Sequence, residues 1–325
     1  MKAAQFSEYG DPTKVLRVVE VSTPTPAPDE VLIRIEATPM RFADLYMMRG
    51  DHGFRPPLPA VPGGTGIGRV TGVGKLVREF EQGDRVYLPR AGTWRQFMTW
   101  RASDLFRAPP EGDPAELAQV NSNGITAHSL LKHDDSLKAG DWIIQSAANS
   151  NCGRYVIQMA KQLGIRTVNV VRQKHKGDQL TALGADVVVE DSESLGNTVR
   201  EATGEAPIRL GFDMVGGVTT GNMAQCMAPF GRIALYGQVS SMPAQVPINL
   251  MLFKHLTLYG FLAETRLREL GKPRSHFQSA YDQISSLVLA GGLSGNVARV
   301  YALDDIGEAL RSLLGGAGGK IVICP

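Results

Sequence analysis

The sequence predicts an α/β protein with two domains, a mainly β domain followed by a parallel, doubly wound sheet. A chain of 325 residues is long for a single hydrophobic core. Before about residue 120, short strand-like runs alternate with Pro and Gly, as in the stretch Pro56–Gly68. From about Leu130 to Phe261, strands alternate with helical segments, and this order is typical of a parallel sheet with helices on both faces.

The individual elements follow from hydrophobic patterning and from the turn residues that bound each run. In the first part of the chain, we expect strands at Lys2–Phe6, Glu30–Glu36, Gly68–Val73 and Asp84–Leu88. In the second part, we expect strands at Asp141–Ala147, Thr167–Val171, Asp186–Val189, Ile208–Val215, Arg232–Tyr236 and Leu256–Phe261. Helices at His276–Ala290 and Asp304–Leu314, the second capped by Asp304 or Asp305, then precede a final strand at Lys320–Cys324.

Composition argues against several classes of function. Hydrophobic residues at 43% and charged residues at 20% describe an ordinary folded protein. The net charge of +2 is too small, and the basic residues too dispersed, for nucleic acid to be the principal partner. No apolar run reaches membrane-spanning length and no charged leader opens the chain, so we expect no membrane partner and a cytoplasmic location. The three cysteines, Cys152, Cys226 and Cys324, are far apart and odd in number, which indicates neither a disulfide framework nor a metal cluster.

Residues 141–176 predict a pocket for a dinucleotide. A buried strand is followed by a small, polar turn, Ser146–Gly153, and by a helix whose apolar residues have helical spacing until Gly164 ends it. Backbone N–H groups in such a turn, together with the N-terminus of the helix, can approach a pyrophosphate. Of the usual glycine fingerprint only the last glycine is present, because Ala148 and Ser150 occupy the two earlier positions.

A basic cluster follows the next strand. An enzyme that selects a free ribose 2′-hydroxyl would place Asp or Glu there, whereas this chain reads Arg172, Gln173, Lys174, His175, Lys176. Two charge-assisted hydrogen bonds to a 2′-phosphate, at roughly 1.5 to 3 kcal/mol each, would favour NADPH over NADH by about two to four orders of magnitude. The alternative is a solvated basic loop.

Several short motifs, in order along nearly the whole chain, make it resemble the medium-chain dehydrogenases/reductases. They are GDRV at Gly83–Val86, NGITA at Asn123–Ala127, LGAD at Leu183–Asp186, FDMVGG at Phe212–Gly217, GRIALYG at Gly231–Gly237 and a C-terminal GGKIVI. The resemblance implies a GroES-like catalytic domain at residues 1–122, a Rossmann NADPH-binding domain at residues 123–262 and a return to the catalytic domain at residues 263–325. It also implies a homodimer.

The resemblance is to a branch without zinc. Zinc-dependent members carry a catalytic Cys and a GHE triplet in the first domain, where this chain reads Met40–Asp44 and Gly63–Gly66. Zinc needs thiolate, imidazole or carboxylate ligands, and no cysteine precedes Cys152. We therefore expect NADPH as the cofactor and no metal.

Two zinc-free branches reduce activated double bonds or quinones. The 2-enoyl thioester reductases are similar to this chain at LPAVPGG (Leu58–Gly64), AGTWR (Ala91–Arg95), ANSNCG (Ala148–Gly153) and VNVVR (Val168–Arg172). The quinone reductases usually lack the Gly-Thr-Trp turn and the Arg after the second strand. The resemblance therefore favours an NADPH-dependent 2-enoyl thioester reductase, with an NADPH:quinone oxidoreductase as the alternative. A protein that binds NADPH without turnover is a second alternative.

The catalytic residues that the resemblance implies depart from the pattern of the enoyl reductases. Those enzymes place a tyrosine, thought to be the proton donor, in a Gly-x-Tyr-Gly segment, and here His52 takes its position. An imidazole can donate a proton near neutral pH. Arg41 replaces the usual Asn and would contact an acidic substrate or an enolate oxygen, or else pair with Asp44. Tyr46 is the alternative proton donor, although a packing role in a helix is the simpler expectation.

The cofactor residues follow from motif position. Asn123 would lie near the nicotinamide or its ribose, and Arg172 and Lys174 would bind the 2′-phosphate. The residues expected to border the pyrophosphate are Ser150, Asn151, Cys152 and Gly153, and those expected to complete the cleft are Tyr236, Gly237, Phe261 and Lys320. Structural roles are the alternatives: Gly237 would end a strand, Phe261 would be core, Lys320 would be a solvated edge residue, and Cys152 would be a small turn residue.

Overall fold

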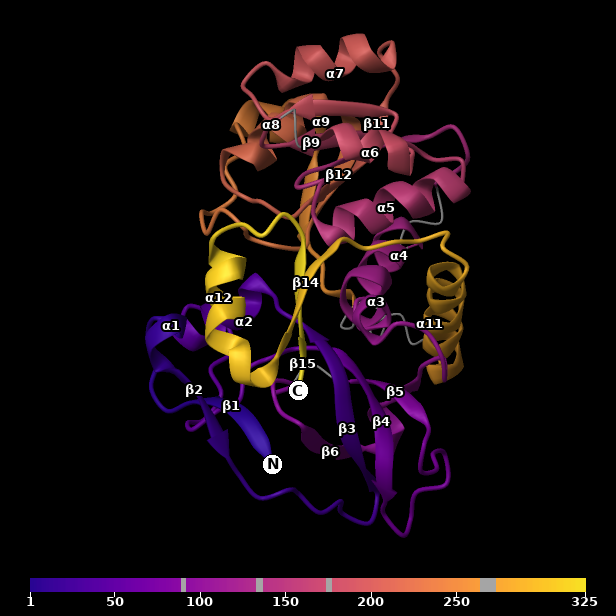
Figure 1. The fold of residues 1–325 in the computed structure, drawn as a ribbon. Helices are drawn as coiled ribbons and strands as arrows, with labels where there is room; N and C mark the ends of the chain where they lie inside the picture. Colours follow the sequence, from indigo (N-terminus) through magenta and orange to yellow (C-terminus); the bar gives the residue numbers. More distant parts are fainter. Residues whose placement is uncertain (89–91, 133–136, 174–176, 264–272) are drawn as a thin grey trace. The chain divides into compact units, whose positions relative to one another are not determined.

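The computed structural model describes residues 1–88, 92–132, 137–173, 177–263 and 273–325 (Figure 1). The chain divides into two compact units. Met1–Ser122 and Arg274–Pro325 form the first, and Asn123–Pro273 form the second. The boundary after residue 262 that the sequence suggested stays a prediction, because residues 264–272 lie outside the described part of the chain.

The first unit is mainly β structure. Its larger sheet has seven strands, in the order β14-β15-β3-β4-β5-β7 with β6 paired to β3. These strands are β3 (Glu30–Pro39), β4 (Gly66–Val73), β5 (Arg85–Leu88), β6 (Phe97–Arg101), β7 (Phe106–Arg107), β14 (Val297–Ala302) and β15 (Lys320–Cys324). A separate antiparallel pair consists of β1 (Lys2–Phe6) and β2 (Leu16–Glu20). The last strand of the chain, β15, thus pairs with the end of β3, which lies in the first forty residues of the chain.

Helices of the first unit flank these sheets. They are α1 (Pro12–Val15), α2 (Phe42–Arg49), α3 (Pro114–Leu117), α11 (Arg274–Leu289) and α12 (Ile306–Leu314). One buried cluster joins Met40, Leu45 and Met48, at and in α2, to Leu310 of α12 and Ile321 of β15. The apolar spacing of α2 and α12 therefore attaches the C-terminal stretch to the start of the chain.

The second unit contains a parallel sheet of six strands, in the order β10-β9-β8-β11-β12-β13. The strands are β8 (Trp142–Gln145), β9 (Arg166–Val171), β10 (Val187–Glu190), β11 (Ile208–Asp213), β12 (Met227–Leu235) and β13 (Thr257–Gly260). The direction of winding reverses between β8 and β11. Ligands of such sheets bind outside the carboxyl ends of the strands at this switch point.

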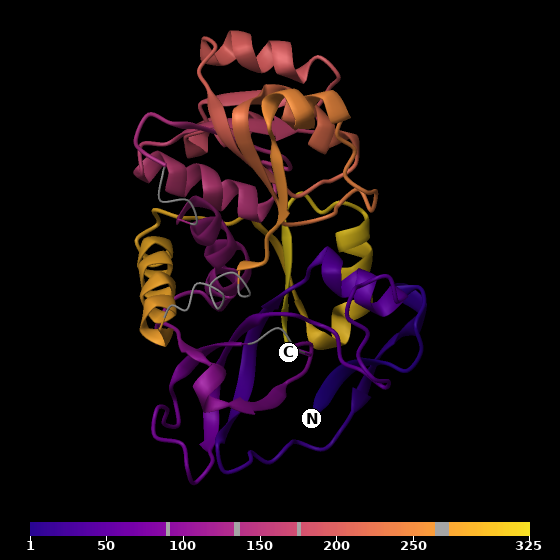
Figure 2. The same cartoon turned by 180° about the vertical axis from the view of Figure 1, so that it is seen from behind.

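Helices cover both faces of this sheet, as Figures 1 and 2 show. They are α4 (Ile125–Lys132), α5 (Asn151–Gln162), α6 (Asp178–Leu183), α7 (Leu195–Thr203), α8 (Val218–Cys226) and α9 (Ile248–Lys254). Ile157 of α5 and Leu180 of α6 pack in one buried cluster, whereas Leu195 of α7 and Met223 of α8 pack in another. The predicted fold class, a mainly β domain plus a doubly wound parallel sheet, is confirmed.

Element boundaries differ from the prediction at caps and turns. The helix after β8 ends at Gln162, and Gly164 adopts a left-handed φ of 69° just beyond it. Asp305 occupies the N-cap position of α12, but its side chain makes no capping hydrogen bond. A 3₁₀ turn, Leu303–Asp305, leads directly into this helix, so Asp305 does not have the extended backbone that lets a side chain reach back. Asp304 instead forms an ion pair with Lys2 at 2.6 Å.

Within the described ranges, no helix is long and apolar enough to cross a membrane.

Candidate functional site

The turn after β8 brings the N-terminus of α5 close to the sheet. Ser150 caps this helix, because its hydroxyl accepts the N–H of Gly153 at 3.1 Å. A β-carbon on Gly153 would lie 2.5 Å from the carbonyl oxygen of Ala148, so only glycine allows this close approach. Ala147 takes a left-handed φ of 48° to make the turn. The result is a tight turn that leads into a helix of twelve residues, which is a suitable place for a pyrophosphate.

A buried amide network fixes this turn against the neighbouring strand. The Gln145 side chain donates to the carbonyl oxygen of Gly153 at 3.1 Å and to the Asn169 side chain at 2.8 Å. Asn169 lies on β9 and donates in turn to Thr167 and Val187. Since Gln145 and Asn169 are both fully buried, this network fixes the positions of α5, β8 and β9 relative to one another.

Asp213, at the end of β11, is the second anchor of the switch point. Its fully buried carboxylate accepts the hydroxyl of Ser146 at 2.7 Å and that of Thr220 at 2.6 Å. It also accepts the backbone N–H groups of Val215 at 2.8 Å and Gly216 at 3.3 Å. One carboxylate therefore joins the loop after β8, the loop after β11 and helix α8.

Tyr236 follows β12 and lies beside Cys152 of α5. The hydroxyl of Tyr236 is buried. Burial first, and the neighbouring Cys152 second, hold the pKa of Tyr236 well above its ordinary value. The phenol is therefore a neutral hydroxyl next to the turn. The structure thus brings together Tyr236 and Cys152, two of the residues that the sequence predicted for the cofactor.

The other predicted cofactor residues of the second unit are more dispersed. Asn123 has a buried amide nitrogen with no hydrogen-bond partner within the described part of the chain. Arg172 follows β9 and is exposed, whereas Lys174 lies outside the described residues. Phe261 is 3% exposed, so it is core as well as a candidate, and a β-carbon on Gly237 would lie 2.8 Å from the carbonyl oxygen of Met214.

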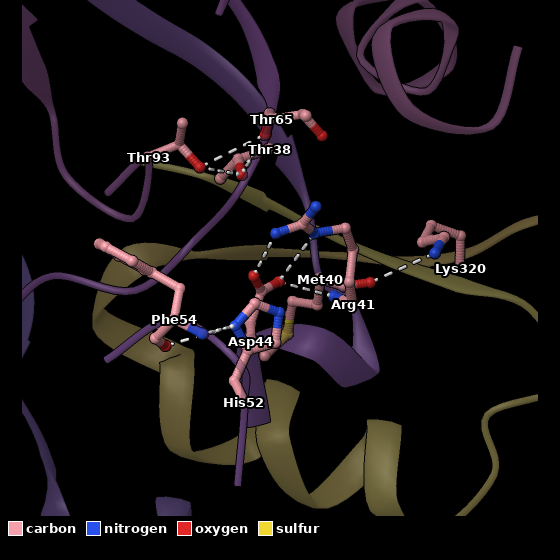
Figure 3. Close-up of polar contacts among 9 residues, drawn as sticks. All are labelled: Thr38, Met40, Arg41, Asp44, His52, Phe54, Thr65, Thr93 and Lys320. Atoms are coloured by element: carbon pink, nitrogen blue, oxygen red, sulfur yellow. Dashed lines mark hydrogen bonds and ion pairs between the residues drawn. The ribbon is translucent and has the colours of Figure 1, made fainter. Parts of the chain in front are cut away.

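In the first unit, Arg41 lies immediately before α2 and pairs with Asp44 (Figure 3). The guanidinium donates to the Asp44 carboxylate at 2.7 Å through Nη2 and at 3.4 Å through Nε. The backbone N–H of Arg41 donates to the same carboxylate at 2.9 Å. The Asp44 side chain is 1% exposed and the Arg41 side chain 22%, so the pair has a buried anion and a cation that reaches the surface of the unit.

The Arg41 guanidinium lies over Gly64. A β-carbon built on Gly64 would lie 1.4 Å from Nη2 of Arg41 and 1.9 Å from its Cζ. The segment that carries Gly64 is held by buried hydroxyl groups, because Thr38 donates to the carbonyl oxygen of Thr65 at 2.8 Å and lies 2.7 Å from the Thr93 hydroxyl (Figure 3). The two segments that differ from the zinc enzymes are thus in contact.

The start of β15 supports the residue before Arg41. The backbone N–H of Met40 donates to the carbonyl oxygen of Ile321 at 2.9 Å. The ammonium of Lys320 donates to the carbonyl oxygen of Met40 at 3.3 Å (Figure 3). The structure therefore places the Lys320 ammonium against the backbone of Met40, the residue before Arg41, although the two are far apart in sequence.

His52 lies in the exposed loop after α2. Its Nδ1 accepts the N–H of Phe54 at 3.1 Å (Figure 3). The candidate proton donor is thus a surface side chain turned back onto its own loop, whereas Tyr46, the alternative, lies half-buried in α2. Their catalytic roles stay predictions.

The residues of the second unit fit a dinucleotide. The glycine-dependent turn and the capped helix N-terminus offer backbone donors of the kind that bind a pyrophosphate. The buried amide of Asn123, which has no hydrogen-bond partner among the described residues, is a further polar group of this unit. As for a metal, the described ranges hold no group of three or more His, Cys, Asp or Glu residues placed to bind one.

Comparison with known proteins identifies the family. A model of the alcohol dehydrogenase GroES-like domain matches residues 27–110, and a model of the zinc-binding dehydrogenases matches residues 152–283. The mitochondrial enoyl-[acyl-carrier-protein] reductase of Xenopus tropicalis is 32% identical over 314 residues, which cover 94% of this chain and 90% of that protein. The chain belongs to the medium-chain dehydrogenase/reductase superfamily.

Solved structures of this superfamily have the same fold. A Bacillus thuringiensis protein assigned as an NADPH:quinone reductase superposes with a TM-score of 0.90 at 26% identity, covering 100% of this chain and 98% of its own. A mycobacterial member solved in complex with NADPH has a TM-score of 0.88 at 28% identity, with complete coverage of both chains. The family that the sequence motifs indicated, a superfamily branch similar to enoyl reductases, is confirmed.

Sequence reasoning did not single out three residues that the structure makes central. The sequence identifies Asp213 only as part of a predicted strand and of the FDMVGG motif, and Gln145 only as part of a predicted strand. It identifies Gly64 only as part of the LPAVPGG motif and of a segment without zinc ligands. An Asp at the carboxyl end of a strand that is predicted to be buried is a signal that could have identified Asp213. A carboxylate in such a place needs several hydrogen-bond donors around it. No signal in the sequence shows that Gly64 touches Arg41.

Proposed function

We propose that this protein is an NADPH-dependent, zinc-independent reductase of 2-enoyl thioesters. The observation that carries the proposal is the 32% identity with an enoyl-[acyl-carrier-protein] reductase over nearly the full length of both chains. Conversion of an activated alkene by such an enzyme needs a hydride donor, a group that stabilises charge on the thioester oxygen and a proton for the α-carbon.

The second unit would hold the cofactor. Ser150, Asn151, Cys152 and Gly153 would border its pyrophosphate, Asn123 would bind near its nicotinamide, and Arg172 with Lys174 would bind its 2′-phosphate. Tyr236, Gly237 and Phe261 would line the same site. When bound, NADPH supplies the hydride.

Residues of the first unit would handle the charge and the proton. Arg41 would donate hydrogen bonds to the thioester oxygen, where negative charge collects during reduction. His52 would give a proton to the α-carbon, with Tyr46 as the alternative donor. Lys320, which contacts the carbonyl oxygen of Met40, would complete the cofactor cleft from this unit.

Quinone reduction is the competing function, and the Bacillus thuringiensis structure favours it. A non-catalytic NADPH-binding role is the third. Steady-state oxidation of NADPH with crotonyl-CoA, set beside oxidation with small quinones, separates the three. We expect the thioester to be reduced faster; the opposite ranking selects the quinone reductase, and tight NADPH binding without any turnover selects the binding protein.

The zinc-independent part of the proposal has its own test. Protein dialysed against a strong chelator should keep its rate with crotonyl-CoA, and adding Zn²⁺ should not raise that rate. A rate that falls on chelation and returns with zinc would sink this part.

Assembly and location are also proposals. The edge strand β13 and the exposed apolar side chains of α9, namely Ile248, Leu252 and Phe253, offer a surface for a homodimer. A single sedimenting species at twice the chain mass would support it.

The sequence predicts a cytoplasmic location, whereas the name of the Xenopus tropicalis relative is mitochondrial. Fluorescence microscopy of a tagged full-length chain would distinguish the two locations.

A further inference from the structure

The contact between Arg41 and Gly64 has the properties of a prepared oxyanion site. Three of the Arg41 contacts go to the buried carboxylate of Asp44, through Nη2, Nε and the backbone N–H. A guanidinium held in this way loses less conformational freedom when it binds a ligand. The side chain is still 22% exposed, so one part of it is accessible from outside the unit.

Gly64 provides the space that the guanidinium occupies. Any side chain at this position would overlap Nη2 and Cζ of Arg41, at 1.4 Å and 1.9 Å from an ideal β-carbon. The backbone beside Gly64 is tightly packed, because its neighbour Gly63 has a left-handed φ of 100° and a β-carbon there would lie 2.4 Å from the Trp94 ring. The backbone of Gly63 and Gly64 therefore forms a packed surface, which we call the seat, and the guanidinium of Arg41 lies on it.

We infer that Arg41, seated on Gly64 and clamped by Asp44, is the group that binds the thioester oxygen of a 2-enoyl substrate, and that Gly64 and Asp44 are its positioning residues. This inference rests on the proposed function. During reduction the β-carbon of the substrate gains a hydride, the alkene electron pair moves toward the thioester, and negative charge collects on the thioester oxygen. A proton then reaches the α-carbon and the charge is discharged. A guanidinium whose position is already set stabilises that charge without reorganising.

The Asp44 partner decides how the site acts on its ligand. Because the carboxylate neutralises the pair, Arg41 does not attract every anion strongly, and its effect is directed to an oxygen within hydrogen-bond reach. The ligand class is therefore a neutral carbonyl that becomes anionic, rather than a permanently charged carboxylate.

The first experiment measures turnover. Arg41→Gln should lower kcat for crotonyl-CoA about 10²- to 10³-fold, as the removal of an oxyanion donor does elsewhere. Affinity for NADPH, measured by fluorescence titration, should change less than twofold, because Arg41 is not one of the predicted cofactor residues and, of these, only Lys320 lies in the same unit. Guanidinium ion added to Arg41→Ala should raise the kcat of this variant at least tenfold. Arg49→Ala, which removes an exposed arginine at the other end of α2, is the matched control and should retain the wild-type rate.

The second experiment needs no turnover. Cinnamoyl-CoA is a 2-enoyl thioester whose absorbance moves to longer wavelength when its carbonyl oxygen accepts hydrogen bonds from a cation. With the protein saturated by NADP⁺, we expect this shift in the wild type and its loss in Arg41→Gln. An equal shift in both proteins would overturn the inference.

Gly64→Ala tests the seat separately from the cation. The three atoms nearest to its methyl group all belong to the movable guanidinium of Arg41, so the melting temperature should stay within about 3 °C of the wild type while kcat falls about tenfold or more. Adding Gly64→Ala to Arg41→Gln should cause little further loss, since Gly64 acts only through the guanidinium that Arg41→Gln has already removed. Gly72→Ala, whose β-carbon would make an ordinary 3.5 Å contact with Leu32, is the glycine control.

Failure of this inference differs from failure of the proposed function. If the wild type neither reduces crotonyl-CoA nor shifts cinnamoyl-CoA, the function is wrong and Arg41 loses its role with it. If the wild type does both and Arg41→Gln or Gly64→Ala does both equally well, the function stands and only the role of Arg41 is wrong.

Discussion

The hydroxyl of Ser146 donates a 2.7 Å hydrogen bond to the carboxylate of Asp213, which joins the carboxyl ends of β8 and β11. These two strands flank the point at which the winding of the sheet reverses. The same hydroxyl accepts the backbone N–H of Met214 at 2.9 Å. The position of the proposed cofactor site therefore depends on one buried carboxylate and the hydroxyl that pairs with it.

Replacing Asp213 by Ala should lower the free energy of unfolding by about 3 kcal/mol or more. The change leaves buried donors from Ser146, Thr220 and the following loop without an acceptor. Urea denaturation followed by circular dichroism measures it. Glu193→Gln, at an exposed position of the same unit, should change the free energy by less than about 0.5 kcal/mol. Equal effects of the two variants would contradict the anchor role.

Two substitutions in the turn after β8 should act in opposite directions. Ala147→Gly relieves a left-handed backbone and should raise stability by about 1 kcal/mol. Gly153→Ala places a methyl group 2.5 Å from a backbone oxygen and should lower stability by about 1 to 3 kcal/mol. Thermal denaturation ranks the two variants, and NADPH titration should show weaker binding only for Gly153→Ala. The reverse ranking would mean that the turn is not held as the structure describes.

Arg172→Ala should weaken NADPH binding about 10- to 100-fold and leave NADH binding unchanged. The expected loss corresponds to one charge-assisted hydrogen bond with the 2′-phosphate. Competitive titration of both dinucleotides supplies the two affinities. Arg209→Ala removes another exposed arginine of this unit and serves as the control. A parallel loss for both cofactors in Arg172→Ala would place Arg172 away from the phosphate.

His52→Ala should lower kcat for crotonyl-CoA about 10²- to 10⁴-fold if the imidazole gives the proton, as we propose. Because His52 is exposed, the substitution should cost little stability, and a lower rate would not reflect unfolding. Asp51→Ala changes the neighbouring exposed side chain and should leave kcat within twofold. An unchanged rate in His52→Ala would move the donor role to Tyr46, and Tyr46→Phe would then show the loss.

Two buried phenols predict a loss of stability at alkaline pH. Burial raises the pKa of Tyr87, although its 2.6 Å hydrogen bond with Ser285 offsets part of the rise, and burial also raises the pKa of Tyr236. An unfolded phenol ionises near pH 10, so above that pH the unfolded state releases protons that the folded state keeps. The free energy of unfolding should therefore fall as pH rises past about 10, by up to about 1.4 kcal/mol per pH unit for each phenol. Urea titrations at pH 9 and 10.5 should show a smaller fall for Tyr87→Phe than for the wild type; equal falls would exclude Tyr87 as a source.

Sequence patterning predicted the order of the elements, because period and turn residues are local properties. β9, for example, begins at Arg166 and ends at Val171, within one residue of the predicted run. Ends of elements were less predictable, since a cap depends on hydrogen bonds that form only in three dimensions. Asp305 shows this: a residue type suited to capping stands at the right position and makes no capping bond.

The candidate site was predictable where its chemistry lies in one continuous segment. The turn from Ser146 to Gly153 and the basic residues that begin at Arg172 are of this kind. Contacts between distant segments were not predictable, because a sequence names residues but not their partners. The pairing of Arg41 with Gly64, and of Ser146 with Asp213, required the folded chain.

The path of the chain orders the events of synthesis. The second unit is continuous in sequence, so a nascent chain can fold it as soon as that stretch leaves the ribosome. The first unit must wait, because Met40, next to Arg41, bonds to Ile321 in the last strand. A chain still being made can therefore assemble the proposed cofactor turn before the corner around Arg41 is supported, so a half-made molecule could capture a dinucleotide before it can act on a substrate.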